Sequence, residues 1–256
     1  MRIPFSKYQG TGNDFIMIDN RSGKVTLEKE KIVALCDRKF GIGADGIVLI
    51  EETGFSNFYM NFYNPDGSQS FCGNGSRCAV RFAQRLGIVG KSGEFKAIDT
   101  KHDFDSDEQV VRIQMKNVLG IEHENGHFVI HTGSPHYIEY AQSIDQMALI
   151  PTAHTVRYSK RFEEQGINVN YVEEIEGGIK MRTYERGVED ETLSCGTGVT
   201  AAALSYGYLH PELNEVTVQT RGGTLKVSFR TVDVGAFEEV HLIGPAHWVF
   251  DGEFEL

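Results

Sequence analysis

The sequence feature that most constrains the fold is an internal repeat whose spacing is close to half of the 256 residues. Four short segments recur in the same order in the second half of the chain, each with a few identical or similar residues. The pairs are Thr11–Phe15 with Thr132–His136, Asp45 with Asn168, Phe71–Gly75 with Ser194–Gly198, and Ala97–Thr100 with Thr217–Thr220. Four ordered matches at nearly one spacing indicate that the chain is built from two similar halves.

The two halves are predicted to have one α+β (α/β) architecture. Short β-branched or aromatic runs such as 15–18, 47–50, 110–115, 178–184 and 216–219 are typical of strands. We expect the first half to span residues 1–117 and the second 118–245, with the last strand, within 246–256, returning to the first half. Only Asn117–Gly120 marks the junction, because no proline- or serine-rich linker separates the halves.

Composition narrows the class of partner. A net charge of −11 disfavours a general nucleic-acid or anionic-membrane surface, since polyanions repel an acidic protein. No apolar run approaches the roughly 20 residues of a membrane-spanning helix, and the N-terminal residues lack the hydrophobic region of a signal peptide. We therefore expect a soluble cytoplasmic protein that acts on a small molecule and keeps its four cysteines as thiols.

Two of these cysteines stand directly before predicted helices. Apolar residues at helical spacing follow Cys72 until Gly87, and a similar pattern follows Cys195 until Gly207. A third helix is predicted for residues 27–39. Cys36 and Cys78 lie on apolar helix faces, which favours a core position for both.

Both Cys72 and Cys195 begin the pattern Cys-Gly-x-Gly. A thiol at the positive end of a helix dipole is expected to have a lowered pKa, and the unpaired N–H groups there can hold a carboxylate. Two such sites, closing on one substrate from opposite sides, provide the base and the acid that inversion of a carbon centre requires. No cysteine or histidine spacing matches a structural zinc site, so we expect no metal.

Several motifs together make the sequence resemble the diaminopimelate epimerase family over nearly its whole length. They are Gln9–Phe15, Arg38–Asp45, Phe62–Ser68, Cys72–Cys78, Tyr184–Gly187 and Cys195–Gly198. The resemblance implies two pseudo-symmetric domains, each a mixed or antiparallel sheet wrapped around a central helix. It also implies epimerisation of LL- to meso-diaminopimelate without a cofactor, in lysine and peptidoglycan precursor synthesis, and commonly a homodimer.

The resemblance also assigns site residues. Cys72 and Cys195 would be the acid/base pair, with His136 and Glu185 tuning their pKa values. The substrate-binding residues would be Asn13, Asn64, Gly73, Asn74, Asn168, Glu185, Arg186, Gly196 and Thr197. Arg186 would grip the distal carboxylate with its two-pronged guanidinium.

Two positions depart from the family pattern, and two other functions stay open. Ser134 stands where the family usually has asparagine, and Gly46 where many members have glutamine, so the substrate contacts at the distal end can differ.

A proline racemase-like enzyme would also use two cysteines, although Arg186 favours a longer, two-headed substrate. A non-catalytic amino-acid-binding module would not need two thiols. An isomerase of the phenazine-synthesis type does not rely on the cysteine pair, so Cys72 and Cys195 disfavour it.

Overall fold

The computed structural model describes residues 1–255, and the chain divides into two compact units. Unit 1 contains Met1–Ile113 and the C-terminal stretch from Gly244, and unit 2 contains Gln114–Ile243. Within the described residues, no helix is both long and apolar enough to cross a membrane.

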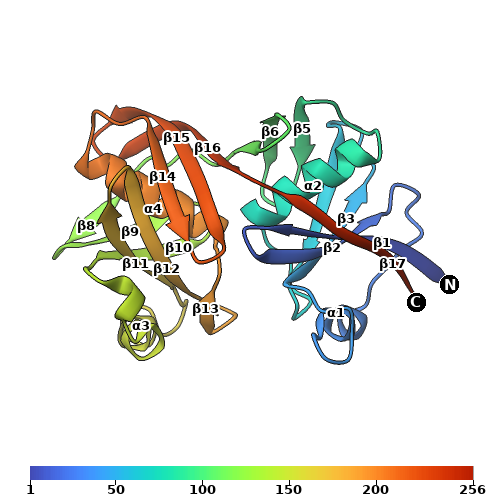
Figure 1. Ribbon diagram of the computed structural model, residues 1–256, viewed down its shortest axis with the longest axis horizontal. Helices are drawn as coiled ribbons and strands as arrows, with labels where there is room; N and C mark the ends of the chain where they lie inside the picture. Colours follow the sequence, from blue (N-terminus) through green and yellow to red (C-terminus); the bar gives the residue numbers. More distant parts are fainter. Residues whose placement is uncertain (256) are drawn as a thin grey trace. The chain divides into compact units, whose positions relative to one another are not determined.

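Unit 1 is a mixed sheet with two helices (Figure 1). The strands lie in the order β17-β1-β2-β3-β4-β5-β6-β7, with parallel pairs at β2–β3 and β4–β5 and antiparallel pairs elsewhere. The elements are β1 (Arg2–Gly10), β2 (Asn13–Asp19), α1 (Lys29–Cys36), β3 (Gly46–Glu51), β4 (Phe58–Tyr63), α2 (Gly73–Arg85), β5 (Ser92–Lys96), β6 (Lys101–Ser106), β7 (Val111–Gln114) and β17 (His247–Glu255). The two ends of the chain are therefore neighbours, since Arg2 pairs with Glu255 across β1 and β17.

Unit 2 repeats this plan. Its strands lie in the order β8-β9-β10-β11-β12-β14-β15-β16, with parallel pairs at β10–β11 and β12–β14, while β13 pairs with β12. The elements are β8 (Glu122–Glu124), β9 (His127–His131), β10 (Pro135–Tyr140), a 3₁₀ turn (Ile144–Gln146), α3 (Leu149–Arg157), β11 (Asn168–Ile175), β12 (Gly178–Glu185), β13 (Asp190–Thr192), α4 (Gly196–Leu209), β14 (Glu215–Thr220), β15 (Gly223–Asp233) and β16 (Ala236–Gly244).

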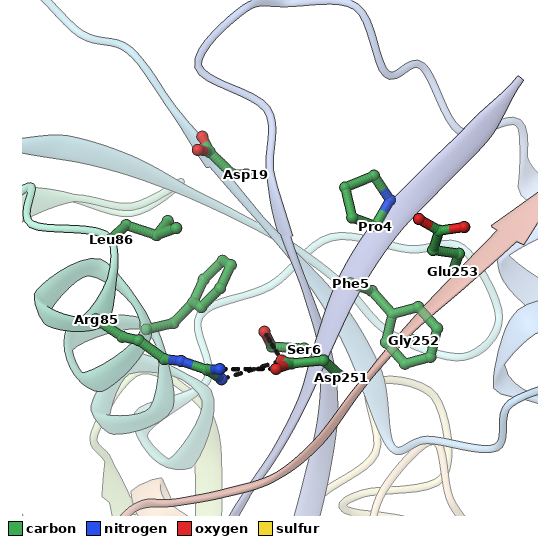
Figure 2. A pocket seen from close by; sticks show the side chains of 10 residues that line it. Pro4, Phe5, Ser6, Asp19, Arg85, Leu86, Asp251, Gly252 and Glu253 are labelled. Carbon is green, nitrogen blue, oxygen red and sulfur yellow. Dashed lines mark hydrogen bonds and ion pairs between the residues drawn. The ribbon is translucent and has the colours of Figure 1, made fainter.

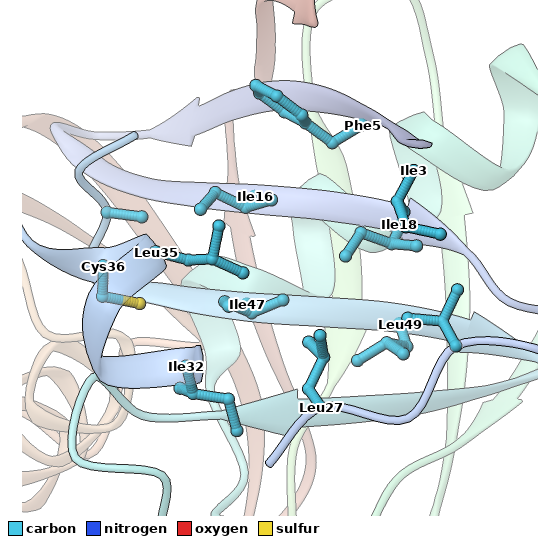
Figure 3. Close-up of a cluster of buried hydrophobic side chains, with 12 residues drawn as sticks. Ile3, Phe5, Ile16, Ile18, Leu27, Ile32, Leu35, Cys36, Ile47 and Leu49 are labelled. Atoms are coloured by element: carbon cyan, nitrogen blue, oxygen red, sulfur yellow. The ribbon is translucent and has the colours of Figure 1, made fainter. Parts of the chain in front are cut away.

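In each unit one face of the sheet packs on an outer helix. In unit 1, Ile16 on β2 and Ile47 on β3 meet Ile32 and Leu35 of α1 in a buried apolar cluster (Figure 3). The helix is shorter than the predicted 27–39 because the Asp37 side chain accepts the N–H groups of Lys39 and Phe40, which ends the helix in a turn. In unit 2, α3 packs against β11 and β12, in a segment for which no helix was predicted.

The second helix of each unit is almost wholly buried against the other face of its sheet. The helices predicted after Cys72 and Cys195 are confirmed as α2 and α4. Gly87, with φ of 71°, follows α2 as expected, but Gly207 lies inside α4 instead of ending it. A Cβ at Gly207 would come within 2.4 Å of the Phe229 ring, so this glycine permits close packing.

The strand registers define which residues of the two halves correspond. His136 pairs with Asn168 across β10 and β11, as Phe15 pairs with Gly46 across β2 and β3. Taking Phe15 as the counterpart of His136, as the sequence repeat does, makes Asn168 the counterpart of Gly46. The sequence pairing of Asn168 with Asp45 is therefore wrong by one residue, because a strand register fixes positions that a few identities cannot.

Candidate active site

In unit 1, Cys72 caps the N-terminus of α2. Its Sγ accepts the backbone N–H of Gly75 at 3.3 Å, so the sulfur lies at the end of the helix where N–H groups are otherwise unpaired. The Asn13 Oδ1 atom accepts hydrogen bonds from the Cys72 thiol, at 3.9 Å, and from Asn74 Nδ2, at 3.3 Å. The predicted residues Asn13, Cys72, Gly73 and Asn74 thus come together at one helix end.

The orientation of the Asn13 amide is fixed by Asp45. Asn13 Nδ2 donates to Asp45 Oδ2 at 2.7 Å, and because a carboxylate only accepts, Oδ1 must be the atom that faces Cys72. Arg38 bridges Asp45 and Asp14, and the buried Lys7 ammonium lies 2.7 Å from Asp14. Burial raises the pKa of Asp14, but hydrogen bonds from Arg38 and Lys7 outweigh burial and lower it, so Asp14 stays charged.

A third cation, Arg77, lies inside unit 1 with no exposed surface. Its guanidinium donates to neutral acceptors, namely Pro245 O at 3.3 Å, Gly73 O at 3.4 Å and Thr11 Oγ1 at 3.5 Å. Among the described residues no carboxylate lies within ion-pair distance of it. Burial lowers the pKa of Arg77 to about 10, and the nearby Cys78 and Cys72 thiols act in the opposite direction. Arg77 is therefore a buried positive charge one helical turn from Cys72.

In unit 2, Cys195 occupies the N-cap position of α4 and is buried, but its side chain makes no capping hydrogen bond. Its Sγ lies 3.4 Å from the Thr197 hydroxyl, which in turn lies 2.9 Å from Nε2 of His136. His136 Nδ1 lies 3.2 Å from Nδ2 of Asn170. The predicted residues His136, Cys195 and Thr197 thus form one hydrogen-bonded group that also includes Asn170, and Gly196 is the first residue of α4.

His136 is neutral in this environment. Complete burial, together with the charges of His131 and Arg186, lowers the pKa of His136 to about 3. A side chain with this pKa does not exchange protons with substrate near neutral pH. Its Nε2 is hydrogen-bonded to the Thr197 hydroxyl, which lies between His136 and Cys195.

Asn168 and Ser134 form a second polar group in unit 2. Asn168 Nδ2 donates to the Ser134 hydroxyl at 2.8 Å and to Pro135 O at 2.9 Å, while its Oδ1 accepts the backbone N–H of Arg186 at 2.9 Å. Both amide protons are used, so Asn168 presents an acceptor to any ligand. The exposed Arg186 guanidinium donates to Gln165 O at 2.7 Å.

Asn64 and Glu185 occupy corresponding positions in the two halves. Tyr63 pairs with Ile47, and Tyr184 pairs with Val169, so the residues that follow each tyrosine are counterparts. Asn64 Nδ2 contacts the hydroxyls of Ser68 and Ser70 in the loop after β4, and Glu185 ends β12. The sequence repeat did not reveal this pair, because the two positions hold different residue types.

The chain also has a cavity of about 600 Å³ in unit 1, at the far end of α2 (Figure 2). Arg85, the last residue of α2, and Asp251 on β17 form an ion pair of 2.7 Å there. None of the predicted site residues lines this cavity. It is therefore separate from the cysteine at the head of the helix.

Sequence reasoning missed Asn170 and Asp45 as members of the two hydrogen-bonded groups. A polar residue within the buried run of β11 was the available signal for Asn170, whereas Asp45 belongs to a repeat pair and to the Arg38–Asp45 motif but was given no role in the site. Cys36 and Cys78 are buried, as expected, and burial raises their thiol pKa values to about 11 and about 12. Among residues 1–255 no histidine, cysteine, aspartate or glutamate side chains group in a way that could hold a metal ion.

Comparison with known proteins adds independent information. A family model described as diaminopimelate epimerase matches residues 5–117 and 128–249. The diaminopimelate epimerase of Flavobacterium psychrophilum is 42% identical over 250 residues, covering 96% of this chain and 97% of that protein. The Chlorobaculum tepidum protein of that name is 41% identical, with 96% and 99% covered. A Bacillus anthracis phenazine biosynthesis protein of the PhzF family, with TM-score 0.77, 12% identity and full coverage of both chains, shares the fold.

Proposed function

Because the chain belongs to the diaminopimelate epimerase family, we propose that it interconverts LL- and meso-diaminopimelate by a two-base mechanism. The observation that carries this proposal is that each unit places one cysteine at the N-cap of a buried helix, in the sequence Cys-Gly-x-Gly. Two thiols at equivalent positions of a repeat are what inversion of a carbon centre requires.

The reaction moves one proton onto one sulfur and another off the second. The thiolate of one cysteine takes the α-hydrogen, and the thiol of the other protonates the opposite face of the carbon. Since the pair exchanges protonation states with each turnover, its titration belongs to both cysteines together. In the reverse direction the two sulfurs exchange roles.

The helix ends stabilise the charge that develops during this step. As the α-hydrogen leaves, negative charge spreads onto the adjacent carboxylate of the substrate. Backbone N–H groups at Gly73, Asn74, Gly196 and Thr197 are the donors for that carboxylate, and they act most strongly in the transition state. No reorganisation is needed, because the helices hold these groups in place.

The distal amino-acid group of the substrate needs other partners. Arg186 supplies a guanidinium for the distal carboxylate, and the Oδ1 atom of Asn168 suits an ammonium group. The residues proposed to complete this region are Asn13, Asn64, Ser134 and Glu185. A cyclic imino acid has neither distal group, so proline is expected to be a poor substrate.

The test is incubation of each isomer with the reduced protein in deuterated water, with no cofactor added. We expect interconversion with deuterium entering the α-position, and loss of epimerisation by at least about 1,000-fold in Cys72→Ala and in Cys195→Ala. Cys36→Ala and Cys78→Ala are matched controls, which remove a buried thiol and should keep the activity. Full activity in both catalytic single variants, or proline turning over faster than diaminopimelate, would contradict the proposal.

The same proposal includes the setting in which the enzyme works. We expect it to act in the cytoplasm, where thiols stay reduced, in the synthesis of lysine and peptidoglycan precursors, without nucleic acid or membrane as a partner.

A homodimer is also proposed. β17 carries three consecutive apolar side chains, Trp248, Val249 and Phe250, each more than 40% exposed, whereas the corresponding strand β8 is short and polar. We expect Phe250→Asp to convert a dimer into a monomer in sedimentation analysis, and a monomeric wild-type protein would overturn the pairing.

A further inference from the structure

The buried hydrogen bonds around His136 depend on the orientation of one amide, that of Asn170. Asn170 has no exposed surface, and its Nδ2 lies 2.9 Å from the carbonyl oxygen of Tyr137. A carbonyl oxygen only accepts, so the atom facing it must be the NH₂ group of the amide. The Oδ1 atom then accepts the hydroxyl of Thr183 at 2.9 Å.

This orientation decides the tautomer of His136. The same Nδ2 lies 3.2 Å from His136 Nδ1, and an amide nitrogen cannot accept a hydrogen bond. His136 Nδ1 must therefore be the acceptor and carry no proton. Because the buried imidazole is neutral, its one proton sits on Nε2.

The tautomer in turn decides where the Thr197 hydroxyl donates. His136 Nε2–H donates to Thr197 Oγ1 at 2.9 Å, which leaves the Thr197 proton to point toward Cys195 Sγ at 3.4 Å. A donor at that sulfur stabilises the thiolate relative to the thiol. With the opposite tautomer, Nε2 would accept the Thr197 proton, and that hydroxyl would no longer donate to the sulfur.

Packing holds this arrangement in place. A Cβ added at Gly198 would lie 2.8 Å from Asn170 Oδ1 and 3.2 Å from the His136 ring. The second glycine of the Cys195 motif therefore lets His136 and Asn170 pack directly against the helix backbone. The corresponding residues of unit 1 are Phe15 for His136 and Val48 for Asn170. The fold is thus built without a polar pair in the other half.

We propose that Asn170 is a positioning residue for the epimerase reaction, which fixes the Nε2–H tautomer of His136 and so directs the Thr197 hydroxyl to Cys195. The inference rests on the proposed two-cysteine function, because it concerns the protonation of one of the two thiols. Asn170 itself has no exposed surface, and its side chain is hydrogen-bonded to His136, Tyr137 and Thr183.

The first experiment reads the tautomer without using activity. In ¹⁵N-histidine-labelled full-length protein at pH 7, the His136 resonances, assigned with His136→Gln, should show a protonated Nε2 and an unprotonated Nδ1. In Asn170→Val the Nε2–H form should no longer dominate. A protonated Nδ1 in the wild type, or an unchanged tautomer in Asn170→Val, would overturn the proposal.

The second experiment reads the thiol and the reaction. Asn170→Val should lower kcat on the order of 10- to 100-fold, the loss expected when a single donor no longer reaches a charged sulfur, with KM changed less than about threefold. In the same variant, the pH above which Cys195 reacts with iodoacetamide should rise. His131 and Arg186, the charges that face His136, are unchanged in this variant. An unchanged kcat and alkylation profile would refute the proposal.

Ser205→Ala is the matched control. It removes a buried hydroxyl from α4, the helix that follows Cys195, and this hydroxyl is bonded to Tyr140 instead of His136. It should show comparable loss of thermal stability without a change in kcat or in the tautomer. If the wild type failed to epimerise diaminopimelate, the proposed function would fall, while the tautomer measurement would still decide the positioning by Asn170.

Discussion

The two units build the same sheet around the same kind of buried helix, yet the three side chains that face the head of that helix differ completely. In unit 1 the register positions hold Phe15, Val48 and Phe62, and the two phenylalanine rings pack edge to face at 6.0 Å. The corresponding trio of unit 2 is polar and fully hydrogen-bonded.

The polar trio of unit 2 consists of His136, Asn170 and Thr183. Since the apolar trio satisfies the fold, we attribute the polar trio to its proposed action on Cys195.

The largest expected effect comes from grafting the apolar pair of unit 1 onto unit 2. The double variant His136→Phe/Asn170→Val should fold, because replacing a hydrogen-bonded buried pair by apolar groups of similar shape is often neutral for stability. Its epimerase activity should fall by at least about 100-fold, since Thr197 loses the donor at His136 Nε2. Circular dichroism and the deuterium-exchange assay measure the two outcomes. A folded, fully active graft would show that the polar pair has no part in the reaction.

A second difference concerns charge. Unit 1 buries Arg77 one turn into α2, whereas residues of the corresponding turn of α4 are neutral. Arg77→Met removes the cation near Cys72, so the pKa of the Cys72 thiol should rise, and kcat should fall on the order of tenfold. Stability should hold or increase, because an unpaired buried charge is costly. Rates of Cys72 alkylation against pH provide the measurement, and Arg81→Met, on the same helix, is the control. A profile that does not move would mean that Arg77 is only structural.

The polar trio also predicts how stability responds to acid. Burial lowers the pKa of His136 from 6.5 to about 3, so between these values the unfolded chain binds a proton that the folded chain does not. Stability is therefore unaffected by His136 above pH 6.5 and decreases as pH falls below it, by up to about 1.4 kcal/mol per pH unit. Urea unfolding at pH 7.5, 6.0 and 5.0 should show a shallower acid loss in His136→Phe/Asn170→Val than in the wild type. If the free energy of unfolding fell equally with pH in the two proteins, the lowered pKa of His136 would be refuted.

The contrast between the units also explains what the sequence could and could not predict. The helices after Cys72 and Cys195 follow from local periodicity, and the glycine-flanked cysteines mark them as chemical sites. Asn170 could not be assigned a partner, because its contact with His136 arises only when β10 and β11 pair in one register. Gly207 was misinterpreted as a helix end for a similar reason, since the Phe229 ring that requires a glycine there comes from β15.

The smallest effect is expected at Asp45. Its carboxylate fixes the orientation of the Asn13 amide in unit 1, as the Tyr137 carbonyl fixes that of the Asn170 amide in unit 2. Asp45 accepts from Asn13 Nδ2, and in Asp45→Asn the new amide can turn either its oxygen or its nitrogen toward Asn13. Asn13 Oδ1 is then no longer required to face the Cys72 thiol, and kcat should decrease about three- to tenfold, the equivalent of one neutral hydrogen bond. Glu215→Gln, which removes an exposed ion pair with Lys226, should leave kcat unchanged. If Asp45→Asn matched this control, the Asn13 amide would be held by the helix end alone, and the parallel between the two halves would stop at their folds.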